Sequence, residues 1–283
     1  MTTKSGKRLR QWEDARASVR GAAHIAQDKP CQDASRTKKG DWYSIACAAD
    51  GHGSERCPFS GEGAEAAVMV AADLLSEVLD AHKGKSFGVL DAHKEIGLPK
   101  QLESRWKERV ELLHAEKERP RDANAAFPYE LYGTTILALA VTEKFVFAMQ
   151  LGDGDILAID GESAPRWLIE PEYEQGGATY SLCMDECWRH VRAKILPLPE
   201  FSDSGENGTP LMFMLTTDGY LNSFSETSGF TKAGADIFEL WRENGAGYIR
   251  GRLEEWLNQS SAAGSGDDIT MVLLYGGSAA QYP

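Results

Sequence analysis

The chain contains few cysteines, no long apolar segment and no surplus of positive charge. Its 283 residues include five cysteines, an odd number, and no Cys-x-x-Cys pair. A disulfide framework or a four-ligand zinc site is therefore not expected. We expect reduced thiols, as is usual in a reducing compartment. No segment has the length and apolar character of a membrane span, and the polar, basic N-terminus lacks the apolar core of a signal peptide. We expect a cytoplasmic protein that does not contact membranes.

The balance of charges is acidic. Lysine and arginine number 30, aspartate and glutamate number 43, and the formal net charge is −13. Because an acidic chain repels a phosphate backbone, nucleic acid is not an expected partner. The hydrophobic content of 42% is sufficient for a core, and the length allows one large domain or two small ones.

What the sequence does contain is a set of short acidic motifs spread over most of its length. They are Cys31-Gln32-Asp33, Asp50-Gly51-His52-Gly53, Thr217-Asp218-Gly219 and Asp267-Asp268-Ile269-Thr270. Three of them adjoin apolar runs, which are typical of buried strands. Each Asp-Gly alone is more simply a turn. Several rigid carboxylates that converge would repel one another unless a cation lay between them, and oxygen ligands suit Mg²⁺ or Mn²⁺. Together, the motifs predict a divalent-metal hydrolytic site.

Hydrophobic periodicity predicts both helices and strands. Residues 1–17 have the composition of a loosely ordered lead-in, and a first strand is expected at 17–23. Helices are expected at 62–81, 99–118, 233–243 and 247–258, and further strands at 42–49, 211–215 and 271–275. Strands at 134–141, 145–151 and 156–160 are expected to form a meander, with a short addition at 167–169. Hairpins of strands and separate runs of helices indicate an α+β fold.

The ordered set of motifs resembles the type 2C protein phosphatases, the metal-dependent Ser/Thr phosphatases, and in particular their bacterial members. The two middle pieces of the family pattern are Gly133-Thr134-Thr135 and Gly152-Asp153-Gly154-Asp155, and the resemblance runs from Val19 to Tyr275. It implies a four-layer α-β-β-α sandwich, in which helices flank two mostly antiparallel β-sheets and the metal site lies at one end between the sheets. It also implies a single domain over residues 18–283, with the family's flap over 171–195.

The resemblance assigns metal ligands to the acidic motifs. It implies two ions, Mg²⁺ or Mn²⁺, and a weaker third ion in many bacterial members. Asp50 would bridge the two ions, and the carbonyl of Gly51 would be a further ligand. The remaining carboxylates would be Asp218 and Asp267 on the first ion, Asp33 on the second and Asp153 on the third, with Asp155 as a substitute for Asp153.

The resemblance also assigns catalytic roles. Asp50 would hold the ions at the reacting phosphate, and His52 would protonate the leaving serine or threonine oxygen, since a histidine near its ordinary pKa is a suitable general acid. An isolated histidine would more simply be an exposed loop residue. Its place directly after Asp50-Gly51 favours the catalytic role.

Two positions depart from the family pattern. The family has an arginine for the substrate phosphate about five residues before the acid of its first motif, and here Asp28 stands in that place. Arg20, His24 and Lys29 are the candidates to replace it. The second departure is Asp268, where asparagine is usual, and its extra charge either tightens metal binding or pairs with a nearby cation.

We therefore expect a Mg²⁺- or Mn²⁺-dependent phosphoprotein phosphatase that hydrolyses phosphoserine and phosphothreonine with a metal-activated water. Its expected partner is a phosphorylated protein, such as a separately encoded Ser/Thr kinase or a substrate of that kinase. Two alternatives stay open. One is a pseudophosphatase that binds a phosphoprotein or kinase without turnover, which the missing arginine favours, and the other is a hydrolase of small phosphate esters.

Overall fold

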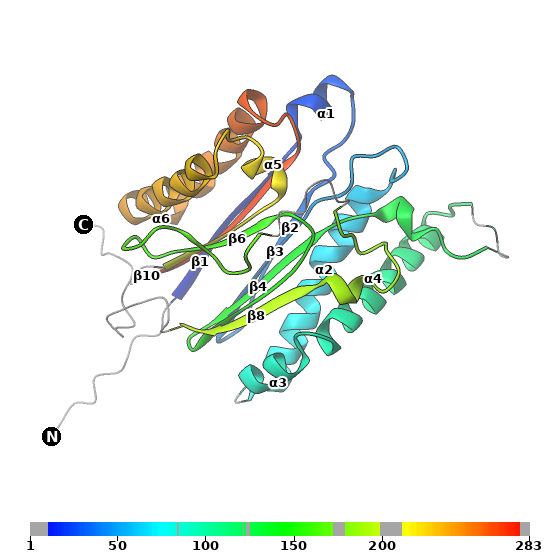
Figure 1. Ribbon diagram of the computed structural model, residues 1–283, viewed down its shortest axis with the longest axis horizontal. Coiled ribbons are helices and arrows are strands. Elements are labelled where there is room, and N and C mark those ends of the chain that lie inside the picture. Colours follow the sequence, from blue (N-terminus) through cyan, green and yellow to red (C-terminus); the bar gives the residue numbers. More distant parts are fainter. Residues whose placement is uncertain are drawn as a thin grey trace.

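Two five-stranded sheets face each other, and helices cover their outer faces (Figure 1). The computed structural model describes residues 11–83, 85–120, 122, 125–171, 179–198 and 211–277. The first sheet has the order β1-β10-β9-β6-β7 and the second the order β2-β3-β4-β5-β8. All the neighbouring strands in both sheets pair antiparallel. The predicted four-layer α+β sandwich is confirmed.

The elements have the following bounds. The first sheet contains β1 (Gln11–Val19), β6 (Asp155–Ile159), β7 (Arg166–Trp167), β9 (Leu211–Thr216) and β10 (Ile269–Gly277). The second contains β2 (Ala34–Lys39), β3 (Tyr43–Ala49), β4 (Ile136–Thr142), β5 (Phe145–Leu151) and β8 (Arg192–Pro197). The α-helices are α1 (Ala22–Ala26), α2 (Ser60–Ala81), α3 (Ser86–His93), α4 (Gly97–Glu116), α5 (Asp218–Leu221) and α6 (Thr227–Ala263). Two 3₁₀ turns cover Tyr129–Tyr132 and Cys187–His190.

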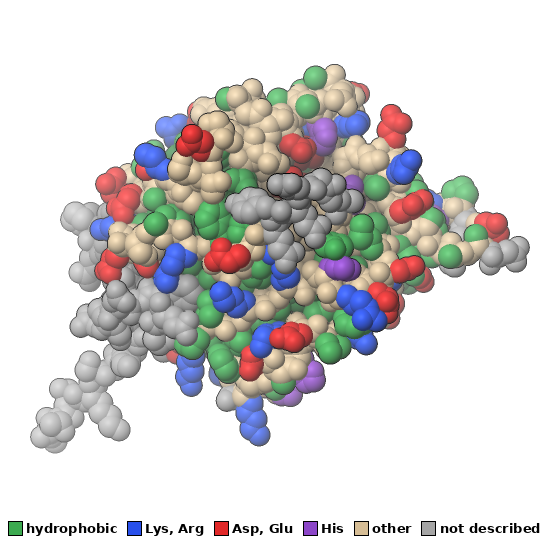
Figure 2. Space-filling view, viewed as in Figure 1, with side chains coloured by type: hydrophobic (Ala, Val, Ile, Leu, Met, Phe, Trp, Pro, Cys, Tyr) green, Lys and Arg blue, Asp and Glu red, His purple; other side chains and the backbone are tan. Residues whose placement is uncertain are grey.

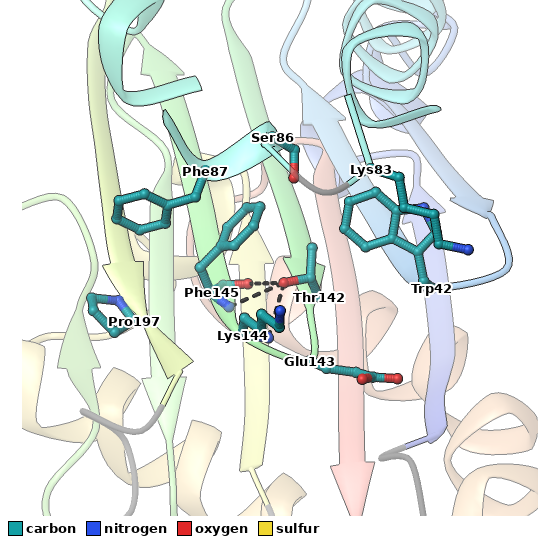
Figure 3. Close-up of a pocket in the computed structure, with 9 residues that line it drawn as sticks. All are labelled: Trp42, Lys83, Ser86, Phe87, Thr142, Glu143, Lys144, Phe145 and Pro197. Atoms are coloured by element: carbon teal, nitrogen blue, oxygen red, sulfur yellow. Dashed lines mark hydrogen bonds between the residues drawn. The ribbon is translucent and has the colours of Figure 1, made fainter. Parts of the chain in front are cut away.

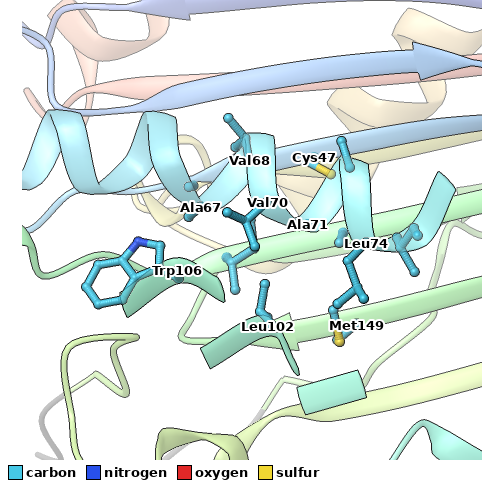
Figure 4. Packing of buried hydrophobic residues seen from close by; sticks show 14 of the residues in the cluster. Cys47, Ala67, Val68, Val70, Ala71, Leu74, Leu102, Trp106 and Met149 are labelled. Carbon is cyan, nitrogen blue, oxygen red and sulfur yellow. The ribbon is translucent and has the colours of Figure 1, made fainter. Parts of the chain in front are cut away.

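The apolar core forms three layers, which explains why the central strands are apolar throughout. One layer lies between the two sheets, one between the second sheet and helices α2 and α4 (Figure 4), and one between the first sheet and α6. Strands β3, β4, β5, β6 and β9 are buried along their whole length. Because both faces of these strands are covered, they need no alternation of polar and apolar residues.

The predicted lead-in is wrong for residues 11–17, which form most of β1. Residues 1–10 lie outside the described part of the chain. Strand β1 is at the edge of the first sheet and pairs with β10 alone. An edge strand is held by one ladder of backbone hydrogen bonds and leaves polar side chains in water. A continuous apolar run is therefore absent, and of the side chains described in this strand, residues 12–19, those of Trp12, Ala15 and Val19 are buried.

The predicted meander is correct for the β4–β5 hairpin and wrong for β6. After Leu151 the chain crosses to the other sheet, where β6 pairs with β9 and β7. The side-chain amide of Gln150 donates to the carbonyls of Gly152 at 3.1 Å and Gly154 at 2.6 Å, which stabilises this crossing. Local hydrophobic pattern cannot distinguish the two sheets, because β6 is buried on both faces.

The helix predictions are largely confirmed. Helices α2 and α4 lie where apolar residues recur at helical spacing, and α6 joins the two segments predicted at 233–243 and 247–258. The break between them is Gly245, whose φ of 76° is available to glycine without strain. Helix α3 was not predicted, since residues 82–98 show no clear apolar stripe.

Candidate metal centre

The end of β3 is anchored to the chain that leads into β4, and this anchoring positions Asp50. The backbone carbonyl of Asp50 accepts hydrogen bonds from Thr135 N and Thr134 Oγ1, both at 2.8 Å. The backbone N–H of Asp50 donates to Thr135 Oγ1 at 3.0 Å. Gly51 forms a β-bridge with Thr134, and a Cβ there would lie 2.5 Å from the carbonyl oxygen of Gln32. Only glycine fits this close approach.

Three carboxylates from distant parts of the chain meet at this point. One oxygen from each of Asp50, Asp153 and Asp218 lies within 4.8 Å of the others. Asp50 follows β3, Asp153 lies in the crossing between β5 and β6, and Asp218 begins α5 after β9. The site therefore lies where the ends of both sheets come together, at one end of the sandwich.

Thr217 connects three of the acidic motifs. Its hydroxyl donates to Asp33 Oδ2 at 2.8 Å and accepts from the backbone N–H of Thr270, also at 2.8 Å. The other oxygen of Asp33, Oδ1, is buried and has no hydrogen-bond partner among the described residues. A buried carboxylate oxygen without a donor is costly and fits a cation ligand. Thr217 belongs to a motif identified in the sequence, but its linking role was not predicted.

The two neighbouring aspartates before β10 have different environments. The side chain of Asp267 is 50% exposed, whereas that of Asp268 is 3% exposed. Asp268 Oδ1 accepts from Gly21 N at 2.6 Å and bonds His24 Nδ1 at 2.8 Å, and its Oδ2 accepts from Gln32 N at 2.6 Å. Asparagine has a single acceptor oxygen, so the carboxylate suits these three contacts better. Asp268 thus joins the N-terminal loop to the last motif.

The carboxylates of the site hold protons more tightly than isolated ones. Burial and the charges of Asp33, Asp218, Asp267 and Asp153 raise the pKa of Asp50 well above its ordinary value. Burial raises the pKa of Asp33 to about 8, although a hydrogen bond from Thr217 opposes this. Burial and the charges of Asp153 and Asp267 raise the pKa of Asp218 to about 6. A divalent cation would replace these protons and relieve the repulsion, so the cluster fits a metal centre.

The two candidates for binding a third ion, Asp153 and Asp155, have different surroundings in the structure. Asp153 is exposed, and its Oδ2 accepts from Thr179 Oγ1 at 2.6 Å. Asp155 is buried, and its Oδ1 accepts from Trp167 Nε1 at 2.6 Å. Burial raises the pKa of Asp155 to about 6. Asp155 lies outside the group of three converging carboxylates, so its position does not favour substitution for Asp153.

His52 lies beside the cluster on the loop after Asp50. Its backbone N–H donates to the carbonyl of Gly133 at 3.0 Å, and its ring covers Gly133, where a Cβ would lie 2.6 Å from His52 Cδ2. Burial lowers the pKa of His52, and the charge of Asp153 opposes this. The ring is half-buried rather than free in solvent, which makes it a candidate proton donor at the edge of the site.

The three candidates for binding the substrate phosphate lie near one another. Arg20 is exposed, and its guanidinium donates to the carbonyl of Lys29 at 3.3 Å. The ammonium of Lys29 donates to the carbonyl of Gly53 at 3.3 Å, one residue after His52. His24 contacts Asp268 instead. Arg20 and Lys29 thus place positive charge beside the loop that carries His52.

The described part of the predicted flap, residues 179–195, is attached to the same framework. Ser181 Oγ accepts from Thr134 N at 2.9 Å, and Leu182 N donates to Thr134 O at 2.9 Å. The rings of Tyr180 and His190 stack with centroids 3.8 Å apart. Residues 172–178 of the predicted flap lie outside the described residues. The segment thus contacts Thr134, the residue that forms the β-bridge with Gly51, and its role as a flap stays a prediction.

A separate cavity of about 550 Å³ lies at the other end of the second sheet (Figure 3). Its lining includes Trp42, Phe87 and Phe145, with the charged groups of Lys83 and Lys144. Trp42 directly precedes β3, whereas Asp50 directly follows it. The cavity is thus a strand length away from the carboxylates and is not part of the site.

On the face shown in Figure 2, acidic and basic side chains are interspersed. Among the described residues, no helix combines the length and the apolar character that crossing a bilayer requires. The converging carboxylates therefore distinguish the site better than overall surface charge does.

The sequence profile of one protein family, protein phosphatase 2C, matches residues 20–258. None of the curated proteins compared with the chain matches it. The match covers all the acidic motifs up to and including Thr217-Asp218-Gly219 and ends before Asp267.

Several solved structures have a similar fold. The catalytic domain of the serine/threonine phosphatase PstP in complex with two manganese ions is 13% identical, with a TM-score of 0.57 and coverage of 96% of this chain and 100% of that one. PppA, a regulatory component of the T6SS in Pseudomonas aeruginosa, is 14% identical, with a TM-score of 0.56 and coverage of 95% and 99%. A C. elegans sex-determining protein is 14% identical, with a TM-score of 0.56 and coverage of 93% of this chain. The chain spans 64% of the length of that protein. At these identities the likeness shows the fold.

Proposed function

The chain belongs to the protein phosphatase 2C family of metal-dependent Ser/Thr phosphatases, and we propose that it hydrolyses phosphoserine and phosphothreonine in proteins with the help of Mg²⁺ or Mn²⁺. The observation that carries this proposal is the convergence of Asp50, Asp153 and Asp218, whose oxygens lie within 4.8 Å of one another. The raised pKa values of Asp50 and Asp218 support it, because they reflect charges that a cation would neutralise.

We assign the metal ligands as follows. Two divalent ions would be held by Asp50, by the carbonyl of Gly51, and by Asp218, Asp267 and Asp33, with Asp153 available for a third. When bound, such ions lower the pKa of a water and neutralise charge on the phosphoryl oxygens. The manganese ions named for the PstP structure belong to that protein, and they support the choice of metal here. Thr217 would orient Asp33 through the hydrogen bond from its hydroxyl.

His52 is proposed to donate a proton to the leaving alkoxide. Its half-buried ring lies beside Gly133, close to the carboxylates that would hold the ions. Because burial lowers the pKa of His52, the protonated ring is a stronger acid but is less populated at neutral pH. Hydrolysis of alkyl phosphates should therefore become faster as the pH falls toward the pKa of His52, as long as the metal stays bound.

Arg20 and Lys29 are proposed to bind the substrate phosphate in place of the arginine that the family has near this point. Arg20 has an exposed guanidinium, which suits a bidentate contact with phosphate. Lys29 already lies against Gly53 and brings a point charge to the same loop. Substitution of Arg20 by methionine should raise KM for phosphopeptides more than it lowers kcat, because the contact is made in the bound substrate as well as in the transition state.

The test is hydrolysis of an aryl phosphate with EDTA, Mg²⁺ or Mn²⁺. Wild type should be active only with metal, and Asp50→Ala and Asp218→Ala should lose the activity. Asp91→Ala is a matched control, since Asp91 lies on α3, outside the site, and pairs there with Lys94 just after the helix. Activity in EDTA, or full activity in both site variants, would contradict the proposal. A folded protein without activity in any metal would instead favour a phosphoprotein-binding module.

A second experiment, in which phosphopeptides and nucleotides compete as substrates, tests the substrate class. Phosphopeptides and nucleotides should be offered at equal concentration to the active protein. We expect preference for phosphoserine and phosphothreonine peptides, and faster turnover of nucleotides would indicate a small-ester hydrolase. A separately encoded Ser/Thr kinase is the proposed natural partner, and the test is loss of phosphate from kinases encoded near this protein.

We also propose a cytoplasmic location. The five cysteines of the chain are all free thiols, and Cys47, Cys57 and Cys187 are buried. Free thiols are usual in reducing compartments. Fractionation of cells that produce the protein would test this, and recovery in a membrane or secreted fraction would contradict it.

A further inference from the structure

His24 lies on the short helix α1, which is fastened to the loop before β10. The backbone N–H of Gly21, directly before this helix, donates to Asp268 Oδ1 at 2.6 Å. The backbone N–H of Ala23 donates to the carbonyl of Gly266 at 2.8 Å. The side chain of His24 is 12% exposed. These contacts hold the imidazole in one place against the last acidic motif.

Hydrogen bonding to Asp268 determines which ring nitrogen of His24 carries the proton. His24 Nδ1 lies 2.8 Å from Asp268 Oδ1, and a carboxylate oxygen that already accepts from Gly21 N can only accept, so Nδ1 donates. In the neutral ring the lone pair is then on Nε2. Nε2 lies 3.9 Å from Asp267 Oδ1, too far for a hydrogen bond but within the reach of two bonds of about 2.1 Å to one ion.

The space in front of His24 Nε2 is faced by a second electron-pair donor. A Cβ on Gly53 would lie 3.4 Å from His24 Nε2 and 3.6 Å from Gln32 Oε1, so both atoms face the same small volume. Gln32 is 8% exposed, and its Oε1 is buried with no hydrogen-bond partner among the described residues. A buried amide oxygen without a donor is costly. This unpartnered oxygen, together with the lone pair of His24 Nε2 and the nearby carboxylate of Asp267, favours a cation in this volume.

Asp267 connects this volume to the metal centre. Its charge raises the pKa of both Asp50 and Asp218, so its carboxylate lies within the electrostatic field of the converging carboxylates. A histidine that donates one N–H to a carboxylate and offers its other nitrogen is the usual arrangement of a metal-binding histidine. Here the carboxylate is Asp268, the residue that stands where asparagine is usual.

We propose that His24 is a nitrogen ligand of the ion held by Asp267, and that it biases the centre toward Mn²⁺ and later transition-metal ions over Mg²⁺. The proposal rests on the metal-dependent function proposed above. Mg²⁺ binds oxygen ligands almost exclusively, whereas the affinity of a site with a nitrogen ligand rises along the transition series from Mn²⁺. Asp268 is then a positioning residue, which fixes the orientation of the ring and keeps the lone pair on Nε2.

The test is pulsed electron paramagnetic resonance of the Mn²⁺-loaded full chain. A ¹⁴N coupling from a directly bound imidazole should appear in wild type and disappear in His24→Gln. His82→Gln is the matched control, since His82 is an exposed residue at the end of α2, and the coupling should persist there. Calorimetric titration should show that His24→Gln weakens Mn²⁺ binding about 10-fold and changes Mg²⁺ binding by less than about 3-fold.

Each outcome bears on the proposal. Absence of a ¹⁴N coupling in wild type, its persistence in His24→Gln, or an equal loss of affinity for both metals would overturn it. A wild-type protein that binds no Mn²⁺ would overturn both this inference and the proposed function. A coupling that depends on His24 in a protein without phosphatase activity would support the ligand and count against the proposed function alone.

Discussion

Substitution of Asp33 by asparagine should stabilise the metal-free protein at alkaline pH. Burial, opposed by the hydrogen bond from Thr217 and reinforced by the charge of Asp268, raises the pKa of Asp33 from 3.8 to about 8. The folded state therefore holds a proton that the unfolded state has released, and stability falls as the pH rises through this interval. A shift from 3.8 to about 8 corresponds to an upper bound of about 6 kcal/mol. Because the charges of Asp33 and Asp50 interact, the shift in pKa does not belong to Asp33 alone, and we expect a measured gain of about 1–3 kcal/mol.

The assay is urea denaturation of wild type and Asp33→Asn in EDTA, at several pH values from about 5 to about 9. The advantage of the variant should grow with pH and level off above the pKa of Asp33. With saturating Mg²⁺ the order should reverse, because wild type gains a ligand that the variant lacks. A variant that is less stable than wild type at alkaline pH without metal would refute the argument that repulsion and burial dominate at this site.

Asp160→Asn provides a control of opposite sign. Burial raises the pKa of Asp160, but hydrogen bonds from the backbone N–H groups of Ser163 and Glu162 outweigh burial and lower it. A lowered pKa contributes stability above the unfolded value, and this contribution is lost as the pH falls. Asp160→Asn should therefore destabilise the protein near neutral pH, with or without metal. The same direction of change in both variants would indicate a general effect of removing negative charge.

Three further predictions concern the site and the core. Thr217→Val removes a hydroxyl that joins Asp33 to Thr270. We expect a loss of about 1–3 kcal/mol of stability in denaturation and weaker Mg²⁺ binding in calorimetry. Unchanged metal affinity would contradict the linking role. His52→Gln should lower kcat for phosphoserine peptides about 10²–10⁴-fold and have much less effect on aryl phosphates, whose leaving group needs no proton; equal losses on both substrates would argue against a general acid. Leu74→Ala, at a fully buried position on the inner face of α2, should cost about 2–5 kcal/mol in urea denaturation and leave the activity of the folded fraction unchanged.

The acidic motifs could be predicted from sequence because their chemistry is local. Asp50 and Asp218 each follow a buried strand, and a strand end is recognisable from the apolar run before it. The convergence of these two carboxylates with Asp153 is a tertiary property, since Asp153 lies in a crossing between sheets that the hydrophobic pattern presented as a hairpin turn. Gln150, which holds that crossing with its side-chain amide, gave no signal in the sequence.

Polar partners of the site were the hardest part to predict. Asp268 departs from the family pattern, and the sequence leaves two alternatives for its extra charge, a tighter metal site or a pairing with a nearby cation. The structure shows three N–H donors around its two oxygens, from Gly21, His24 and Gln32. These donors lie more than two hundred residues away in the chain, so no local pattern could reveal them. Edge strand β1 was missed for a related reason, because its stability comes from pairing with β10.

The sequence by itself determined the apolar strands, the two long amphipathic helices under the second sheet and the oxygen ligands at strand ends, because burial and backbone geometry act over a few neighbouring residues. Tertiary structure alone decided which sheet each strand joins, which carboxylates meet and which of them remain buried without a donor. These outcomes depend on pairing between distant segments, and the repulsion that makes the site bind a cation exists only after the fold has brought the charges together.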